Sequence, residues 1–304
     1  MVFILQLPYK TAVSPRKAAD MKSAVTCLTN SILFQRVALR SVATFLFTLS
    51  TVGLTPAAWA GDFTIAAASS LQDALNELKP ALQMELKDVS LRISAGASGT
   101  LQQQIMQGAP IDLFLSADDR PIRVLTKANQ LVPGSSFALL ANQLVLIAPN
   151  PSSIASIADL KSPKFKRIAI GEPRTVPAGD YAMQTLSWLK LDKDLSGRFV
   201  FAKDVRQVLS YVERGEVDAG FVYRSDLESK AGKSVTLVSE APAGSHKPIR
   251  YFAAVVAASK HQMQAKKLLS YLKGPKAALV WAKYGFSPLS PVASVGKAKV
   301  SASK

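Results

Sequence analysis

Apolar positions along the chain follow two alternating spacings from Phe63 onward. A short apolar run at 63–67 is typical of a buried strand. Leucines and alanines then recur every three or four residues over 71–86, which marks one face of a helix. Pro80 stands inside that pattern and is expected to kink or split the helix, because proline lacks the N–H that a helix interior uses.

The same alternation continues through most of the chain. Further strands are predicted at 91–94, 111–115, 144–148, 167–170, 219–223 and 251–257. Further helices are predicted at 101–107, 180–190, between Asp204 and Gly215, at 264–273 and at 276–284. This rhythm indicates parallel βαβ units with helices on both faces of a sheet, so the predicted fold class is α/β. Residues 291–304 are expected to form a flexible basic tail.

The first sixty residues have the pattern of an export signal. Basic residues precede an uncharged apolar run at 42–54, and Ala58-Trp59-Ala60 follows as a cleavage signal. The run would form about 20 Å of helix, shorter than the ~30 Å hydrocarbon core of a bilayer. We expect cleavage after Ala60 and a freely soluble periplasmic protein, with an uncleaved anchor as the alternative. Met21 looks like a more ordinary start, so residues 1–20 are a candidate extension.

Composition excludes several classes of function. The chain has one cysteine, Cys27, and two histidines, His246 and His261, so neither a disulfide framework nor a Cys- or His-rich metal site is expected. The net charge is +16. Residues 1–60 hold six of the 37 Lys and Arg residues and one of the 21 acidic ones, which leaves about +11 for the rest. No aromatic-interleaved basic stripe accompanies this charge, so nucleic acid is not an expected partner.

Three predicted junctions between a strand and a helix carry small polar residues. They are Ser69-Ser70, Ser98-Gly99-Thr100 and Asp204-Val205. A helix N-terminus presents unpaired N–H groups and partial positive charge, so it favours anions. None of the three has the lysine of a phosphate-binding P-loop. The alternative is that these residues are ordinary helix caps, so an anion site requires all three to converge.

Longer motifs in a fixed order give the chain a family resemblance. They are AAASSLQDAL (66–75), ASGTL (97–101), GAPIDLFLSAD (108–118), GEPRTVPAGDYA (171–182), DVR (204–206), VERGEVDAGFVYRSD (212–226), YLKGP (271–275) and YGF (284–286). Together they span essentially all of 62–288. In this order they resemble the substrate-binding proteins of bacterial molybdate ABC transporters, which have the type II periplasmic binding-protein fold.

The resemblance implies a set of ligand-binding residues. Ser70 and Ser98 would supply hydroxyl groups, Ala178 and Val205 backbone N–H groups, and Tyr223 its phenol. Ser69 stays an alternative to Ser70, because many relatives have a single serine at this place. Molybdenum would be held only as its oxyanion, by these same residues, with no separate metal and no cofactor. Tungstate, which is nearly the same size, is expected to bind as well.

The resemblance also implies an architecture and partners. Two α/β lobes, 61–142 with 250–304 and 143–249, would be joined by strands crossing near 142–148 and 249–255, with the ligand in the cleft between them. An anion bridging the lobes would favour their closure. The expected partner is the membrane permease of an ABC transporter, and the protein itself is expected to be a monomer and not an enzyme.

Other readings of the residues remain open. The same fold could bind sulfate, phosphate or a carboxylate, and a carboxylate would call on Arg174 or Arg206, which flank site positions. A hydrolase is the less favoured alternative, because His246 lies in what reads as a return loop and no Gly-x-Ser-x-Gly motif is present. Asp112, Asp118 and Asp119 suggest paired carboxylates, although the last two read as a loop.

Overall fold

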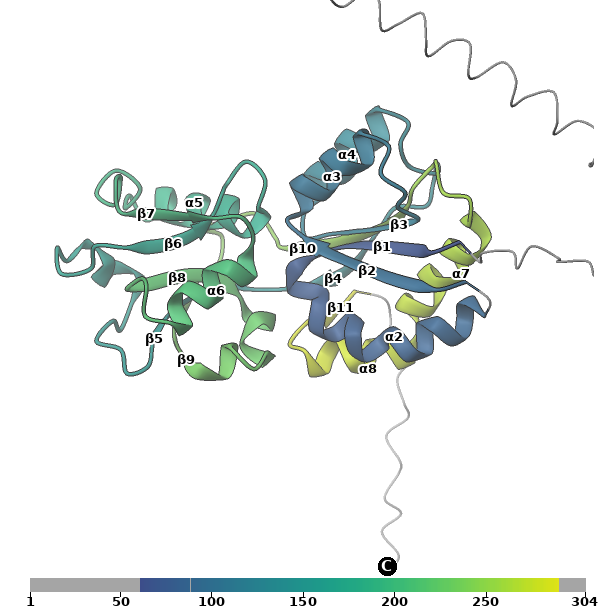
Figure 1. Ribbon diagram of the computed structural model, residues 1–304. Coiled ribbons are helices and arrows are strands. Elements are labelled where there is room, and N and C mark those ends of the chain that lie inside the picture. The colour runs from purple at the N-terminus through teal and green to yellow at the C-terminus, as the bar shows by residue number, and fades with distance from the viewer. Residues whose placement is uncertain (1–60, 88, 290–304) are drawn as a thin grey trace, which may run out of the picture. The chain divides into compact units, whose positions relative to one another are not determined.

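The computed structural model describes residues 61–87 and 89–289 (Figure 1). The expected export signal, its cleavage site and the expected basic tail beyond residue 290 lie outside these ranges. Within them, no helix combines the length and the apolar character needed to cross a bilayer.

The first sheet has six strands in the order β11-β4-β10-β3-β1-β2 (Figure 1). Their bounds are β1 Phe63–Ala68, β2 Leu91–Gly96, β3 Leu113–Ser116, β4 Phe137–Ala141, β10 Arg250–Val255 and β11 Ser287–Pro288. Strand β1 is parallel to both β2 and β3, whereas β10 is antiparallel to β3 and β4. We call this sheet with its helices lobe 1.

The second sheet has five strands in the order β7-β6-β8-β5-β9. Their bounds are β5 Leu144–Pro149, β6 Ile168–Gly171, β7 Phe199–Ala202, β8 Ala219–Tyr223 and β9 Val235–Glu240. Strand β6 is parallel to β7 and β8, and β5 is antiparallel to β8 and β9. We call this sheet with its helices lobe 2. The chain passes between the lobes twice, at 142–143 and at 241–249.

Each sheet is therefore mixed, and the prediction of parallel βαβ units was wrong for β5 and β10, which are antiparallel to both of their neighbours. The reason lies in the two crossings. A parallel neighbour needs a long crossover, usually a helix. Strand β5 enters lobe 2 directly from β4, and β10 re-enters lobe 1 through a loop, so neither has such a crossover. Only three strands at one side of each sheet, β1, β2 and β3 in lobe 1 and β6, β7 and β8 in lobe 2, have the βαβ connection that the pattern indicated.

The helices cover both sheets. Lobe 1 carries α2 Gln72–Leu86, α3 Ser98–Met106, α4 Asp119–Lys127, α7 Gln262–Lys273 and α8 Pro275–Lys283, and lobe 2 carries α5 Pro177–Trp188 and α6 Val205–Glu213. Short 3₁₀ helices lie at η2 Ser69–Leu71, η3 Ile157–Lys161, η4 Arg224–Glu228 and η5 Gly232–Ser234. The apolar stripe predicted on α2 is buried against the core, at Ala74, Leu75, Leu78, Leu82 and Leu86.

Helix α2 runs as one element through Pro80, so the split that the sequence predicted does not occur. Pro80 is exposed, and so is Asn76, whose carbonyl loses its helical partner. Water can satisfy that carbonyl on the solvent side, while the buried leucines on the other side hold the helix together. Packing of the apolar face outweighs the local cost of the proline.

Candidate functional site

Four helix starts meet at one small cavity between the lobes. Its lining consists of Ala68, Ser69, Ser70, Gly96, Ala97, Ser98, Ala117, Val176, Pro177, Ala178, Val205 and Tyr223. All five residues that the resemblance implied are in this set, as is the alternative, Ser69. The atoms of the lining leave about 200 Å³ of empty space, part of it open to solvent. Pockets for drug-sized ligands are about 300–1,000 Å³, so this space suits an ion of a few atoms.

Strand register brings the residues of lobe 1 together. Strands β1 and β2 are parallel neighbours, and their last residues, Ala68 and Gly96, are paired. The chain after each strand therefore leaves the same edge of the sheet, where one strand leads into η2 and the other into α3. Ser70 and Ser98 lie at these two starts and are buried. Ser98 is the first residue of α3, so the predicted turn over 96–100 is in fact largely helix.

Lobe 2 repeats this arrangement. The ends of β6 and β7 are paired at Gly171 and Ala202. They lead into α5 and α6, where Ala178 is the second helical residue and Val205 the first. A helix supplies no acceptor for the N–H groups of its first turn, so those groups are available to a ligand. The sequence placed the start of α5 three residues late, because Pro177 read as a turn residue, whereas proline is favoured at the first helical position.

The hydroxyl groups of Ser70 and Ser98 do not cap helices, so the alternative that these two serines are ordinary helix caps is excluded. No side chain caps η2, α2 or α3 in the structure. The Oγ atom of Ser98 instead accepts a hydrogen bond from the Ala117 N–H at 3.0 Å, and the Oγ atom of Ser70 lies 2.8 Å from the Oη atom of Tyr251. Asp204 does cap α6, since its carboxylate accepts from the Gln207 N–H.

Tyr223 is the last residue of β8 and lines the same cavity. Its side chain is 2% exposed, and its Oη atom has no hydrogen-bond partner among the residues that the structure describes. Burial raises the pKa of Tyr223 well above its ordinary value, so the phenol keeps its proton. A buried donor without a partner costs about 1–3 kcal/mol. The orphaned hydroxyl therefore marks a place where an acceptor fits.

The two lobes touch directly beside the cavity. The Gly99 N–H, in the first turn of α3, donates to the Thr175 carbonyl of lobe 2 at 2.9 Å. A Cβ atom on Gly99 would come within 2.8 Å of the Thr175 backbone, so only glycine allows this approach. Arg120 of lobe 1 also donates to the Pro173 carbonyl of lobe 2 at 3.3 Å.

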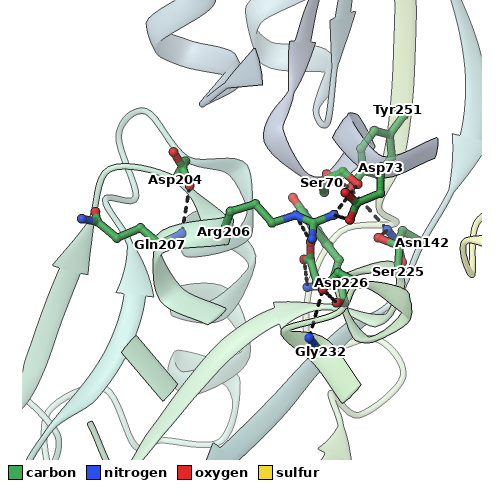
Figure 2. Close-up of polar contacts among 12 residues, drawn as sticks. Ser70, Asp73, Asn142, Asp204, Arg206, Gln207, Ser225, Asp226, Gly232 and Tyr251 are labelled. Carbon is green, nitrogen blue, oxygen red and sulfur yellow. Dashed lines mark hydrogen bonds and ion pairs between the residues drawn. The ribbon is translucent and has the colours of Figure 1, made fainter. Parts of the chain in front are cut away.

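A charged cluster lies on another side of the cavity, around Arg206 (Figure 2). Its Nη2 atom is 2.9 Å from the Asp73 carboxylate of lobe 1, and its Nε atom is 3.2 Å from the Asp226 carboxylate of lobe 2. Its Nη2 atom also lies 3.4 Å from the Ser70 carbonyl. Burial raises the pKa of Asp226 to about 6, and the Arg206 charge opposes that rise. The guanidinium thus joins the lobes and neutralises two carboxylates.

Neither arginine considered for a carboxylate ligand lines the cavity. Arg174 is 88% exposed and pairs with Glu172, and Arg206 is engaged as just described. Among the residues that do line the cavity, none is charged. The donors that it offers are neutral hydroxyl and amide groups.

The residues considered for catalysis have structural partners. Asp112 is buried and accepts from the Thr64 N–H and the Ser259 hydroxyl. Asp118 caps α4 and Asp119 begins it, so the loop predicted there is wrong. His246 is half-buried, with its ring against the Lys247 carbonyl. Within 61–87 and 89–289, no three His, Cys, Asp or Glu side chains are grouped as a metal site would require.

A small donor-lined cavity between two α/β lobes is a typical place for a ligand, because binding sites occur preferentially at domain interfaces. The family model for bacterial extracellular solute-binding proteins matches residues 63–287, and the chain belongs to that family. This confirms the predicted fold class, that of the type II periplasmic binding proteins, and the assignment to binding rather than catalysis. It also agrees with a location outside the cytoplasm.

Relatives make the family assignment more specific. The chain is 40% identical over 226 residues to a putative ABC transporter substrate-binding lipoprotein of Bacillus subtilis, covering 74% of this chain and 85% of that protein. It is 37% identical to the molybdate-binding protein ModA of Escherichia coli, covering 75% and 89%. The solved periplasmic molybdate-binding protein of Azotobacter vinelandii is similar with a TM-score of 0.66 and 27% identity, covering 74% and 98%.

Proposed function

We propose that this protein captures molybdate, and tungstate equally, outside the cytoplasm and delivers it to the membrane permease of an ABC transporter. The observation that carries the proposal is the buried Tyr223 hydroxyl, which has no partner within 61–87 and 89–289 and belongs to an uncharged cavity where four helix starts converge. The names of the relatives point to the same ligand. The protein acts as a monomer that is secreted through a cleavable signal ending at Ala60.

The chemistry of the cavity supports this ligand class. Hydroxyl groups of Ser70, Ser98 and Tyr223 and the N–H groups of Ala178 and Val205 can all donate, and none carries a fixed charge. Such a set suits a dianion with no proton of its own. Hydrogen phosphate is a poorer fit, because its own O–H needs an acceptor. Selection against sulfate then depends on the size of the cavity.

The expected affinity follows from the number of donors. Hydrogen bonds to a charged partner contribute roughly 1.5–3 kcal/mol each. Five of them, less the entropy lost on association, correspond to a binding free energy of about −8 to −12 kcal/mol, or micromolar to nanomolar Kd. The ligand bridges both lobes, so it stabilises the closed arrangement that a permease can recognise.

Calorimetric titration of the purified protein tests the proposal. The panel is molybdate, tungstate, sulfate, phosphate and a small carboxylate such as citrate. We expect molybdate and tungstate to bind with similar Kd and the others at least 100-fold more weakly. A thermal-shift screen gives an independent reading, since a ligand at 1,000 times its Kd adds about 4.1 kcal/mol of stability. Tighter binding of sulfate, phosphate or the carboxylate would overturn the assignment.

A further inference from the structure

The Ser70 hydroxyl has a buried neighbour that is not part of the cavity lining. The Oη atom of Tyr251, on β10, lies 2.8 Å from the Ser70 Oγ atom. The Nδ2 atom of Asn142, where the chain first crosses between the lobes, lies 3.3 Å from the same Oη atom. Figure 2 shows the three side chains close together. The direction of each hydrogen bond among them decides what Ser70 offers to a ligand.

The direction at Asn142 is set by its other contacts. Its Oδ1 atom accepts from the Gln143 N–H at 2.8 Å, so the amide nitrogen is on the opposite side. That nitrogen donates to the Ser225 Oγ atom at 2.8 Å and faces the Tyr251 Oη atom with its second hydrogen. An amide NH₂ group can only donate. The Tyr251 oxygen is therefore an acceptor toward Asn142.

The Tyr251 proton must then point to the remaining neighbour. Tyr251 is 1% exposed, and burial raises its pKa well above its ordinary value, so the phenol is protonated. In the described part of the chain its hydroxyl contacts only Asn142, which cannot accept, and Ser70. A buried hydroxyl proton without an acceptor is costly. Tyr251 thus donates to the Ser70 Oγ atom.

Ser70 is left with its own proton, and the residue lines the cavity. Ser98 also keeps its own proton for donation, because its Oγ atom accepts a hydrogen bond from the Ala117 N–H. Both serines consequently have a hydrogen that is free to be donated to an oxyanion.

We propose that Tyr251 and Asn142 are positioning residues that fix the Ser70 hydroxyl as a hydrogen-bond donor toward an oxyanion in the cavity. This inference rests on the proposed function, because it assumes that Ser70 contacts the ligand. It concerns two residues that contribute no atom to the cavity lining. Their effect on binding must therefore pass through Ser70.

A double-mutant cycle tests the proposal, with sodium molybdate as the probe and Kd from calorimetry. Tyr251→Phe keeps the aromatic ring, which packs edge-on against Phe286 with centroids 5.3 Å apart, and removes only the hydroxyl. We expect it to weaken molybdate binding about 3- to 10-fold in the wild-type background. In a Ser70→Ala background it should change Kd by less than twofold, because there is no hydroxyl left to orient.

Asn142→Asp supplies a second test, because it replaces the donor with an acceptor. Tyr251 would then donate to the new carboxylate, and Ser70 would turn its lone pair toward the ligand. We expect Asn142→Asp to weaken molybdate binding at least as much as Ser70→Ala. In the Tyr251→Phe background only the effect of the added charge remains, so the loss should shrink severalfold. If Tyr251→Phe folds poorly, combining Asn142→Asp with Ser70→Ala still tests whether the effect on binding passes through the Ser70 hydroxyl.

The outcomes separate the two levels of the proposal. If wild-type protein does not bind molybdate, the proposed function fails. If it binds, but Tyr251→Phe or Asn142→Asp costs the same factor with and without the Ser70 hydroxyl, the residues act by packing or charge and the positioning role is overturned. Coupled losses support it.

Discussion

Val205 and Arg206 are adjacent residues at the start of α6, yet they belong to two regions of opposite character. Val205 lines a cavity that offers neutral donors only. Arg206 turns away from it to Asp73 and Asp226, in a cluster of full charges. The difference shows how one helix start can serve two tasks. The cavity offers neutral dipoles to a charged ion. The charges of Arg206, Asp73 and Asp226, in contrast, neutralise one another and connect the two lobes.

The largest effect is expected from removing both hydroxyls on the lobe 1 side of the cavity. Ser70→Ala with Ser98→Ala should weaken molybdate binding by about 3–6 kcal/mol, since each hydrogen bond to a charged partner contributes roughly 1.5–3 kcal/mol. Ser98→Ala alone should leave the lobes open in small-angle scattering with molybdate present. Calorimetry gives the affinities, and Ser270→Ala, on the exposed side of α7, is the control. If the Ser98→Ala protein closed with molybdate as the wild type does, the proposed role of Ser98 in the cavity would be contradicted.

Next in size is the loss of the arginine from the charged cluster. Arg206→Met leaves the fully buried Asp226 without its charge partner, and breaking such a pair costs about 3–5 kcal/mol. We expect the lower end of that range, because Asp226 can escape by binding a proton. Urea unfolding of the unliganded protein measures it. Adding Asp226→Asn should restore part of the stability, and an equal or larger loss in the double variant would contradict the pairing.

The pH dependence of stability tests the same charged cluster through Asp226. The pKa of Asp226 is about 6 in the folded protein and lies near 3.8 when the chain is unfolded. Between these values the folded state holds a proton that the unfolded state releases, so stability falls as pH rises from about 4 to 6. The expected change is on the order of 2–3 kcal/mol. Urea midpoints of wild type and Asp226→Asn across this window measure it, and parallel curves would refute the assignment.

The smallest of these effects is the most specific to binding. Tyr223→Phe should weaken molybdate binding by about 1.5–3 kcal/mol. It should leave the unliganded protein equally stable or slightly more stable, because the hydroxyl that is lost has no partner in the described structure. Tyr211→Phe, on the flank of α6, is the matched control. A loss of stability without a loss of affinity would make Tyr223 a structural residue.

Local pattern was sufficient to predict most of the central strands and the helices beside them. Of the strands it missed, β7 and the partly exposed β9 lie at sheet edges, and the internal strand β4 has only two buried residues among its five, so burial does not impose a clear alternation on them. The order of the strands could not be predicted from local pattern either, because the antiparallel placement of β5 and β10 results from the path of the chain between the lobes.

The residues of the candidate site could be predicted from the sequence, but the hydrogen bonds and ion pairs around them could not. Ser70, Ser98, Ala178, Val205 and Tyr223 came from a family resemblance, and their role as ligands stays a prediction, although the structure gathers them at one cavity. The Tyr251 hydroxyl lies 181 positions from Ser70 along the chain, and Asn142 is 109 positions from Tyr251. No local signal marks either residue. The engagement of Arg206 with Asp73 likewise depends on two elements from different lobes.

A crystal structure of the protein grown with molybdate tests the central claim most directly. We predict the ion in the cavity between the lobes, with its oxygens accepting hydrogen bonds from Ser70, Ser98, Ala178, Val205 and Tyr223, and with Arg206 still paired to Asp73. An ion coordinated by lysine or guanidinium groups, or found outside that cavity, would contradict the account.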